Sequence, residues 1–298
     1  MARCIFCENK ADSKEHLYGA WLQKVYNVNP SPKGKRRHLE SRVTPDGAPF
    51  VATNGNFSKG GHQLNTTVQK AICQSCNSSW LSDIQDYMRP IFKKFTHNGD
   101  LLLSSADQKT IVQWLYLKQL LYQFATETLN GLSWDQRSAL QAQRVNCPPE
   151  EQLVRAKEKW LEDDCAYFRR NVLPPSDVRF FVSRALYDNK SLGGFNYVPR
   201  VAFYSRRGEG QIRGFAFGYL TLIHIGHFFA TIHKPIVVQG ESMVSLPISL
   251  PRCLIEISSR WTKEVMLNQV RVSHRDAEHR LLSHLVQQSQ GEVRFNYP

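Results

Sequence analysis

The sequence predicts an α+β protein of two domains, covering residues 1–100 and 101–298. Three observations lead to this expectation. Paired Cys-x-x-Cys motifs organise the first domain, helical apolar spacing fills the middle of the chain, and alternating apolar residues with glycine turns mark its C-terminal part. A chain of 298 residues is long enough for two domains that each bury a core. We therefore expect a cysteine-organised N-terminal unit, a helical middle region, and a C-terminal antiparallel sheet with helices.

The composition indicates a globular protein with a polyanionic partner. The chain is 42% hydrophobic and 11% aromatic, and its formal charge of +12 gives a pI near 9.4. Nucleic acid is the commonest partner of such a protein, although basic proteins without one are also common.

No targeting segment or membrane span is expected. Residues 1–7 lack the apolar core of a signal peptide, which favours a cytoplasmic location. Residues 214–233 carry no Asp, Glu, Lys or Arg, but their three glycines and alternating aromatic residues favour strands over a spanning helix.

Four of the seven cysteines form two Cys-x-x-Cys pairs, whose members are Cys4, Cys7, Cys73 and Cys76. In a reducing cytoplasm such pairs indicate metal ligands before disulfides. Together the two pairs supply the four thiolates that a structural Zn²⁺ requires in a tetrahedron. A redox pair or chance spacing is the alternative. The remaining Cys147, Cys165 and Cys253 follow no pattern and are expected to be buried thiols.

A polar insertion separates the two cysteine pairs. Apolar spacing predicts a short helix over residues 17–25, and the insertion covers 27–66, with a hairpin around 42–44 and 50–52. It also holds the most basic point of the sequence, formed by Lys33, Lys35, Arg36 and Arg37. We expect these side chains to bind the phosphates of nucleic acid, with a solvated loop as the alternative.

A strand over 68–72 is expected to lead into the second cysteine pair. A helix is expected to follow over 77–95, bent or ended by Pro90. Its apolar face would be formed by Trp80, Leu81, Ile84, Met88 and Ile91.

The middle region is expected to be helical. Capping-box spacing begins at Ser105 and at Ser133, and prolines at 148 and 174 begin and stop a further helix. The apolar stripes of these helices are assigned to the core and to no chemistry.

The C-terminal part is expected to form an antiparallel sheet, closed by a helix over 276–288. Strands are expected over residues 178–184, 198–204, 211–223, 228–233 and 253–257. Turns are expected at residues 193–194, 206–210 and 224–227.

Polar residues stand directly beside each cysteine pair. Glu15 and His16 follow the first pair, and Asn77 follows the second. Taken singly, His16 has a simpler interpretation as a surface histidine and Asn77 as a helix N-cap. Because a metal bound by both pairs would join the two motifs, we expect it also to bring these three residues together.

This arrangement of Cys-x-x-Cys, Glu-His, and Cys-x-x-Cys-Asn with Trp80 resembles the zinc-containing branch of the His-Asn-His (HNH, ββα-metal) endonucleases. It is similar in particular to uncharacterised bacterial and phage proteins with an HNH-like N-terminal unit. The resemblance covers about residues 4–95. It implies a ββα unit in which His16 is the general base, and in which Glu15 and Asn77 bind a catalytic Mg²⁺ or Mn²⁺.

The chemistry of these residue types agrees with the implied roles. A hard cation prefers carboxylate and amide oxygens, and a neutral histidine suits proton abstraction from water near pH 7. The resemblance thus predicts an endonuclease that cleaves DNA, with RNA as the alternative substrate. It also implies a role in the conflict between phages and their hosts. Residues 101–298 would select the substrate, or bind a protein partner or a second copy.

The sequence departs from the family pattern at two positions, and the first of them, Val68, favours an alternative function. Val68 stands where the family has an asparagine that braces the loop of the base, and Asn65 lies three residues earlier. Gln85 stands where the family helix often has a carboxylate. The alternative function is a non-catalytic zinc-knuckle module that binds nucleic acid or protein.

Two further sets of residues were weighed. Three histidines could form a second metal set, but packing is the expected role of His224, His227 and His233. Three arginines among the aromatic strands could contact a nucleic-acid backbone, namely Arg206, Arg207 and Arg213.

Overall fold

The computed structural model describes residues 3–16, 21–25, 40–43, 49–52, 57–58, 67–69, 71–97, 99–127, 150–186, 193–205, 212–234, 254–260 and 262–271. The basic side chains predicted to bind phosphate, the helix predicted over 276–288 and the capping box predicted at Ser133 lie outside these residues. The same holds for Asn65, Cys147, Cys253, Arg206 and Arg207, and for the side chain of Arg213.

The N-terminal region consists of short strands and helices. Its elements are β1 (Lys14–His16), α1 (Leu22–Val25), β2 (Glu40–Val43), β3 (Pro49–Ala52), β4 (Phe57–Ser58), β5 (Thr67–Gln69) and α2 (Gln74–Asn77). Strands β1, β5 and β4 form a three-stranded antiparallel sheet in that order. Strands β2 and β3 pair separately, which confirms the predicted hairpin. Strand β5 ends at Gln69, earlier than expected.

Helix α3 (Trp80–Thr96) has the predicted apolar face, on which Leu81, Ile84, Met88 and Ile91 are buried. The predicted start of the helix was wrong. The helix begins at Trp80 because the residues from Gln74 to Asn77 form the separate turn α2. Of the two effects expected of Pro90, ending the helix does not occur, because the helix continues through this residue. Proline lacks only one N–H group, and the rest of this long buried face keeps the segment helical.

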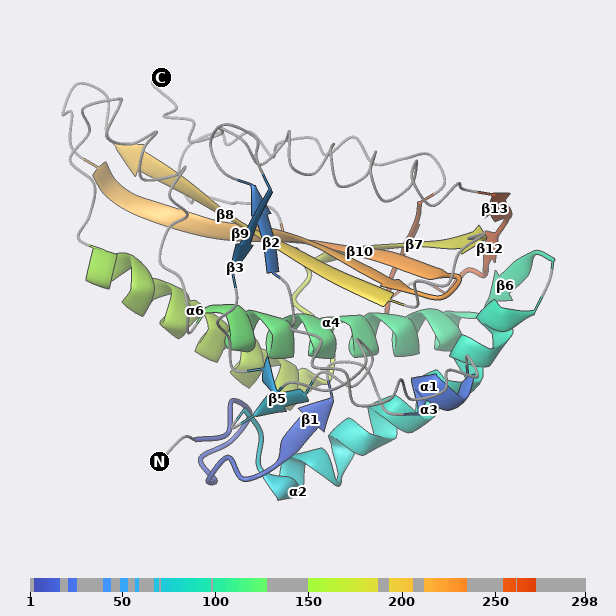
Figure 1. Ribbon diagram of the computed structural model, residues 1–298, viewed down its shortest axis with the longest axis horizontal. Helices are drawn as coiled ribbons and strands as arrows, with labels where there is room; N and C mark the ends of the chain where they lie inside the picture. Colours follow the sequence, from blue (N-terminus) through green and yellow to red (C-terminus); the bar gives the residue numbers. More distant parts are fainter. Residues whose placement is uncertain are drawn as a thin grey trace.

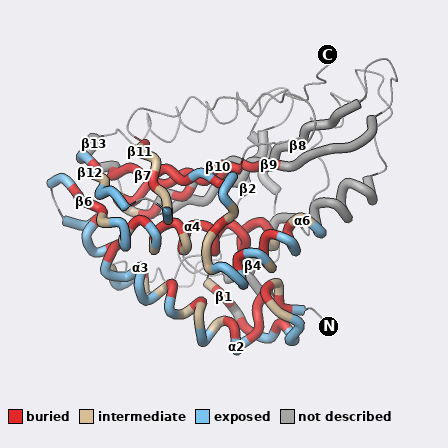
Figure 2. The backbone as a smooth tube through the Cα atoms, turned by 180° about the vertical axis from the view of Figure 1, so that it is seen from behind, coloured by how far each residue is buried: buried red, intermediate tan, exposed pale blue. Residues whose placement is uncertain are grey.

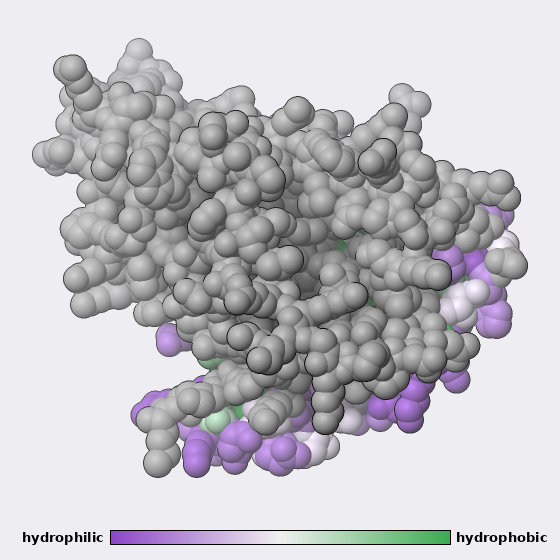
Figure 3. All heavy atoms as spheres, viewed as in Figure 1, coloured by the Kyte–Doolittle hydropathy of each residue, from purple (hydrophilic) through white to green (hydrophobic). Residues whose placement is uncertain are grey.

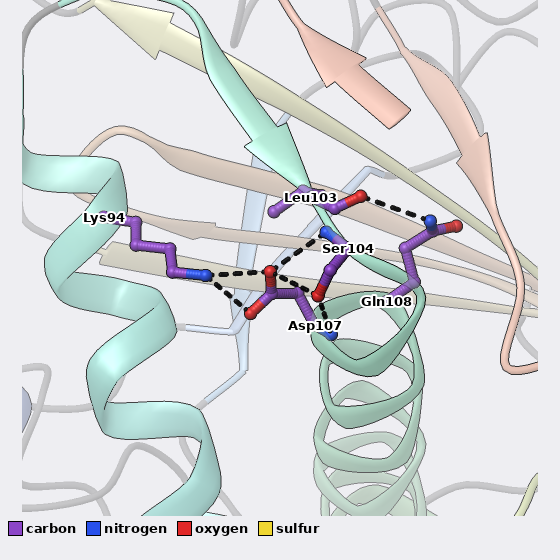
Figure 4. A network of polar contacts seen from close by, with 5 residues as sticks. All are labelled: Lys94, Leu103, Ser104, Asp107 and Gln108. Atoms are coloured by element: carbon purple, nitrogen blue, oxygen red, sulfur yellow. Dashed lines mark hydrogen bonds and ion pairs between the residues drawn. The ribbon is translucent and has the colours of Figure 1, made fainter. Parts of the chain in front are cut away.

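Helix α4 (Ser105–Glu127) begins with a capping box one residue earlier than expected. The N–H of Asp107 donates to Ser104 Oγ at 3.1 Å, and the N–H of Ser104 donates to Asp107 Oδ2 at 3.0 Å. Lys94 of α3 donates to both oxygens of Asp107 at 2.8 Å, as Figure 4 shows. Gln108 Nε2 donates to the carbonyl of Lys263 at 2.6 Å. The start of α4 is therefore tied both to α3 and to the C-terminal part of the chain.

The C-terminal part is a largely antiparallel sheet, and helix α6 (Glu150–Asn171) precedes it in the chain. Its strands are β7 (Arg179–Leu186), β8 (Gly193–Ser205), β9 (Ile212–Ile225), β10 (Phe228–Lys234), β11 (Ile255–Ile257) and β13 (Gln269–Arg271). Neighbours run β11-β7-β10-β9-β8, and β13 pairs in parallel with β7. The predicted α+β class is thus confirmed, together with an antiparallel C-terminal sheet.

Two of the predicted turns differ from expectation. Gly193 and Gly194 belong to strand β8, where they pair with β9. The turn between β9 and β10 is restricted to Gly226 and His227, and Gly226 adopts a φ of 55°. A two-residue hairpin turn requires this left-handed conformation, which glycine adopts without steric cost.

Helix α4 lies at the centre of the molecule. Figure 1 places α4 and α6 beneath one face of the sheet, with α3 and β1 on the far side of α4. Between Ile111 and Gln123 the helix is therefore largely buried, as Figure 2 shows by colour, and Ile111, Trp114, Leu117 and Leu121 have no appreciable exposure. By contrast, Figure 3 shows mostly hydrophilic side chains on the outer surface over α2 and α3.

The core is continuous between the N-terminal region and the sheet. Phe228 of β10 packs against Phe92, Phe95 and Trp114, with ring centroids 4.9 to 6.2 Å apart. In addition, β6 (Leu101–Leu103) pairs with β12 (Val265–Leu267). Within the described part of the chain, no helix has the length and apolar character needed to cross a membrane.

Candidate metal centre

Each cysteine pair lies in a tight turn of the backbone. In the first pair, the N–H of Cys7 donates to the carbonyl of Cys4 at 3.3 Å. In the second pair, Cys73 is the N-cap of α2, and its Sγ accepts from the N–H of Cys76 at 3.4 Å. Backbone N–H groups that point at sulfur favour the thiolate form, as in zinc knuckles.

Main-chain hydrogen bonds hold the two turns together. The N–H of Ile5 donates to the carbonyl of Ala71 at 2.9 Å, and the N–H of Ser13 donates to the carbonyl of Ile72 at 3.0 Å. Asp12 Oδ1 accepts from the N–H of Gln74 at 2.9 Å. The segment after the first pair therefore lies alongside the segment before the second pair.

As predicted, the structure brings the four thiols together in what we call the cysteine cluster, formed by Cys4, Cys7, Cys73 and Cys76. Their sulfur atoms all lie within 4.8 Å of one another, and Cys7 Sγ lies 3.5 Å from Cys73 Sγ and 3.7 Å from Cys76 Sγ. A tetrahedral Zn²⁺ with bonds of about 2.3 Å places its sulfur ligands about 3.8 Å apart. All four cysteines are free. The cluster could therefore hold a metal ion such as zinc.

The thiols of the cluster differ in acidity. Burial raises the pKa of Cys4 and of Cys76. Burial acts in the same direction on Cys73, but the N–H of Cys76 and the neighbouring thiols stabilise its thiolate and lower its pKa to about 7. Cys73 is thus the thiol that loses its proton most easily, and a metal ion that binds the cluster would displace the protons of the others.

The cysteine cluster is packed against helix α6. The ring of Phe6, inside the first pair, meets Trp80 edge-on with centroids 5.2 Å apart. Trp80 in turn packs against Phe168 at 5.7 Å, and Arg169 stacks over the Trp80 ring at 5.2 Å. Aromatic pairs of this geometry stabilise a contact beyond the burial of their area. The end of α6 is therefore part of the support of the cluster.

Glu15 is buried and holds a lysine from the centre of the molecule. Its Oε1 accepts from Lys118 Nζ at 2.8 Å and from Gln85 Nε2 at 2.6 Å. Lys118 also donates to the main-chain carbonyl of His16 at 2.8 Å, and its side chain is only 1% exposed. A charge this deeply buried requires an opposite charge and hydrogen bonds, and both are present.

Two indole groups fix the orientation of Gln85. Its Oε1 accepts from Trp21 Nε1 and from Trp114 Nε1, each at 3.3 Å, so its amide nitrogen faces Glu15. A carboxylate at this position would face the carboxylate of Glu15. The amide at position 85 thus has a physical reason: Glu15 needs a hydrogen-bond donor there. We call the set of Glu15, Gln85, Lys118, Trp21 and Trp114 the Glu15 network.

His16 follows Glu15 on β1 and is partly buried. Burial lowers the pKa of its imidazole; the carboxylate of Glu15 opposes this shift and the ammonium of Lys118 adds to it. Its Nδ1 is buried without a hydrogen-bond partner among the described residues.

Asn77 contacts the segment that leads into β1. Its Nδ2 donates to Ser13 Oγ at 2.6 Å, and its N–H donates to the carbonyl of Cys73 at 3.0 Å. Asn77 ends α2, and the N-cap of α3 is Ser79, so the simple N-cap interpretation of Asn77 was wrong. Ser13 and Glu15 are two residues apart and share one side of the chain, so Asn77 approaches that side.

Of the three histidines considered as a second metal set, His227 lies in the turn between β9 and β10, and His233 lies near the far end of β10. Their main chains are about 20 Å apart, because six residues of extended chain separate them. This distance is too long for both side chains to bind one metal ion. In the described part of the chain, the cysteine cluster is the only group of three or more residues with metal-ligand geometry.

Sequence reasoning missed Lys118 because its helix was assigned to the core. A signal was nevertheless present: Lys118 and Gln119 interrupt an otherwise apolar run from Trp114 to Leu121. A lone lysine in such a run indicates a buried charge that needs an acidic partner. A second pair of this kind joins Lys234 to Asp164 at 2.8 Å.

No protein-family model, curated protein or solved structure matches this chain.

Proposed function

We propose that the chain is a metal-dependent, HNH-like endonuclease that hydrolyses phosphodiester bonds in DNA. The observation that carries the proposal is the buried Nδ1 of His16, which has no hydrogen-bond partner among the described residues and lies at the end of the strand that follows the first cysteine pair. A buried polar atom without a partner requires an explanation, and burial keeps this imidazole neutral. A neutral imidazole is the form that can accept a proton from water.

In this proposal His16 takes a proton from the attacking water. The oxygen of that water forms the new bond to phosphorus, and the bond from phosphorus to the 3′ oxygen breaks. A Mg²⁺ or Mn²⁺ ion would supply charge stabilisation to the leaving oxygen. The cysteine cluster would hold a structural Zn²⁺, which keeps the two motifs together.

Glu15 and Asn77 offer the oxygen ligands that a hard cation prefers. Glu15 Oε1 already accepts two hydrogen bonds, whereas its Oε2 accepts none from the described residues. The Nδ2 of Asn77 donates to Ser13 Oγ, which brings the Asn77 side chain to the segment that leads into Glu15. The proposed ligand atoms are Glu15 Oε2 and Asn77 Oδ1.

The test is cleavage of plasmid and single-stranded DNA, and of RNA, with Mg²⁺ or Mn²⁺. We expect His16→Ala to lose activity by more than about 100-fold while its zinc content and melting temperature remain those of the wild type. The matched control is His97→Ala, because His97 is exposed at the end of α3. If His16→Ala cleaves DNA as fast as His97→Ala does, His16 is not the base.

A second candidate is a non-catalytic zinc-knuckle module that binds nucleic acid or protein. The engagement of Glu15 Oε1 by Lys118 and Gln85 favours it, because these contacts give the carboxylate a structural role. Elemental analysis and calorimetry distinguish the candidates. Both predict one tightly bound zinc per chain, but only the nuclease predicts a second, weaker site for Mn²⁺ that Glu15→Gln abolishes.

Under the leading proposal, residues 101–298 select the substrate or bind a protein partner. The phosphate backbone of the nucleic acid is bound by the basic side chains of Lys33, Lys35, Arg36 and Arg37. The proposed setting is the cytoplasm, where four thiols stay reduced and available to a metal. The proposed role is phage–host conflict.

A further inference from the structure

Helix α4 lies outside the motifs that define the proposed active site, yet one of its side chains reaches that site. Lys118 Nζ lies 2.8 Å from Glu15 Oε1 and 2.8 Å from the carbonyl oxygen of His16. It therefore contacts two consecutive residues of β1, one through its side chain and one through its main chain. Among the described residues, no other charged side chain forms an ion pair or hydrogen bond with either group.

These two contacts restrict β1 in different ways. The bond to Glu15 sets the position of its carboxylate, and the bond to the carbonyl of His16 sets the rotation of the peptide that carries the imidazole. Gln85 adds a donor to Glu15 at 2.6 Å, and the indoles of Trp21 and Trp114 hold Gln85 in place. The end of β1 is thereby attached to α4, the most deeply buried helix.

We propose that Lys118 is a positioning residue of the active site, which holds Glu15 and the main chain of His16 in place from helix α4. The inference rests on the proposed nuclease function. It extends the site into the region beyond residue 100, where no chemistry was expected. Lys118 itself touches neither the substrate nor the reacting atoms in this assignment.

The matched control for Lys118 is Lys234. Lys234 is also buried, at 6% exposed, and it donates to Asp164 at 2.8 Å, so Lys234→Met removes a buried ion pair of the same kind away from the site. Both variants should retain one zinc per chain. We expect Lys118→Met to lose about 100-fold in kcat with KM for DNA changed by less than about threefold, because misplacement of a reacting group acts on the chemical step. Lys234→Met should keep kcat within about threefold.

A second readout does not depend on activity. In ¹⁵N–¹H spectra, the main-chain signals of Glu15, His16 and Leu17 should shift in Lys118→Met and stay in place in Lys234→Met. If Lys118→Met does not fold, Lys118→Gln is tested instead, because the amide of glutamine keeps a hydrogen-bond donor but carries no charge. The Gln variant should show the same shifts and a smaller loss of kcat.

Three results would overturn the inference: equal loss of kcat in the Lys118 and Lys234 variants, unchanged kcat in Lys118→Met, or unchanged β1 signals. An inactive wild type would instead count against the proposed nuclease function. In that case the β1 signals still decide whether Lys118 holds this strand.

Discussion

The guanidinium of Arg169 lies over the indole ring of Trp80, 5.2 Å from its centroid, and thereby joins the last turn of α6 to the second cysteine motif. Phe168, the preceding residue, packs against both Trp80 and Phe6. A metal ion bound by the cysteine cluster would thus stabilise more than the loops that hold it. It would fix the aromatic surface on which α6 rests.

Removal of the metal is expected to destabilise the whole protein. Chelation, or Cys76→Ser, should lower the free energy of unfolding by at least about 3 kcal/mol, because a structural metal contributes folding energy directly. For a chain of this size, that corresponds to a melting temperature lower by roughly 6–12 °C. Calorimetry with and without added zinc measures the difference.

The control for this prediction is Cys165→Ala. Cys165 is a buried cysteine of α6 that lies outside the cysteine cluster. Its variant should keep one zinc per chain and respond to chelation as the wild type does. An unfolding transition of Cys76→Ser that matches the wild type in zinc would show that the cluster is not a structural metal site.

The buried ion pair of Glu15 and Lys118 gives a prediction about stability. Removing one partner, as in Glu15→Gln or Lys118→Met, should cost about 3–5 kcal/mol, because the other group is left buried without compensation. The double variant should cost less than the sum of the two. Urea denaturation measures all three. In the exposed pair of Arg3 and Glu8, Arg3→Ala should change stability by less than about 0.5 kcal/mol.

The capping box of α4 should make stability depend on pH. Burial alone would raise the pKa of Asp107, but Lys94 and Ser104 outweigh burial and lower it. A carboxyl group with a lowered folded-state pKa stabilises the protein above its unfolded value of about 3.9 and loses this contribution as the pH falls through the folded value. Asp107→Asn should therefore cost about 1–2 kcal/mol at pH 7. The difference from the wild type should shrink below about pH 3.9, as urea titrations at several pH values would reveal.

The cysteine cluster could be predicted from the sequence because its information is local. Each Cys-x-x-Cys pair specifies a turn, and four thiols in a reducing environment specify a ligand set. The apolar faces of α3 and α4 could be predicted for the same reason, since periodicity is visible within one segment.

The partners of Glu15 could not be predicted, because they come from two elements, α3 and α4, that are distant from Glu15 in the sequence. The contact with Gln85 spans 70 residues and the contact with Lys118 spans 103. The spacing of residues predicted a capping box that begins at Ser105, whereas the hydrogen bonds show that it begins at Ser104 and is closed by Asp107. Lys94 of α3 holds the Asp107 carboxylate, so a tertiary contact supports this cap. Tertiary contacts thus determined both the partners of Glu15 and the start of α4.

The amide at Gln85 is expected to be essential to the Glu15 network. Gln85→Glu would place two carboxylates about as close as the present 2.6 Å contact and remove the donor to Glu15. Two like charges at that distance repel, and the single charge of Lys118 offsets only one of them, so the folded state should bind a proton at this pair more tightly than the unfolded state does. Stability should therefore rise as the pH falls through the raised pKa of the pair, the opposite direction to Asp107.

Comparison of Gln85→Leu with Gln85→Glu distinguishes the effect of an added negative charge from the effect of lost hydrogen bonds. Gln85→Leu removes the donor to Glu15 and leaves the indoles of Trp21 and Trp114 without their acceptor, so it should destabilise the protein by about 1–3 kcal/mol. That cost should not vary between pH 5 and pH 8, whereas the cost of Gln85→Glu should. If the two variants show the same pH dependence of unfolding, Gln85 does not face the Glu15 carboxylate in solution, and Lys118 alone holds it.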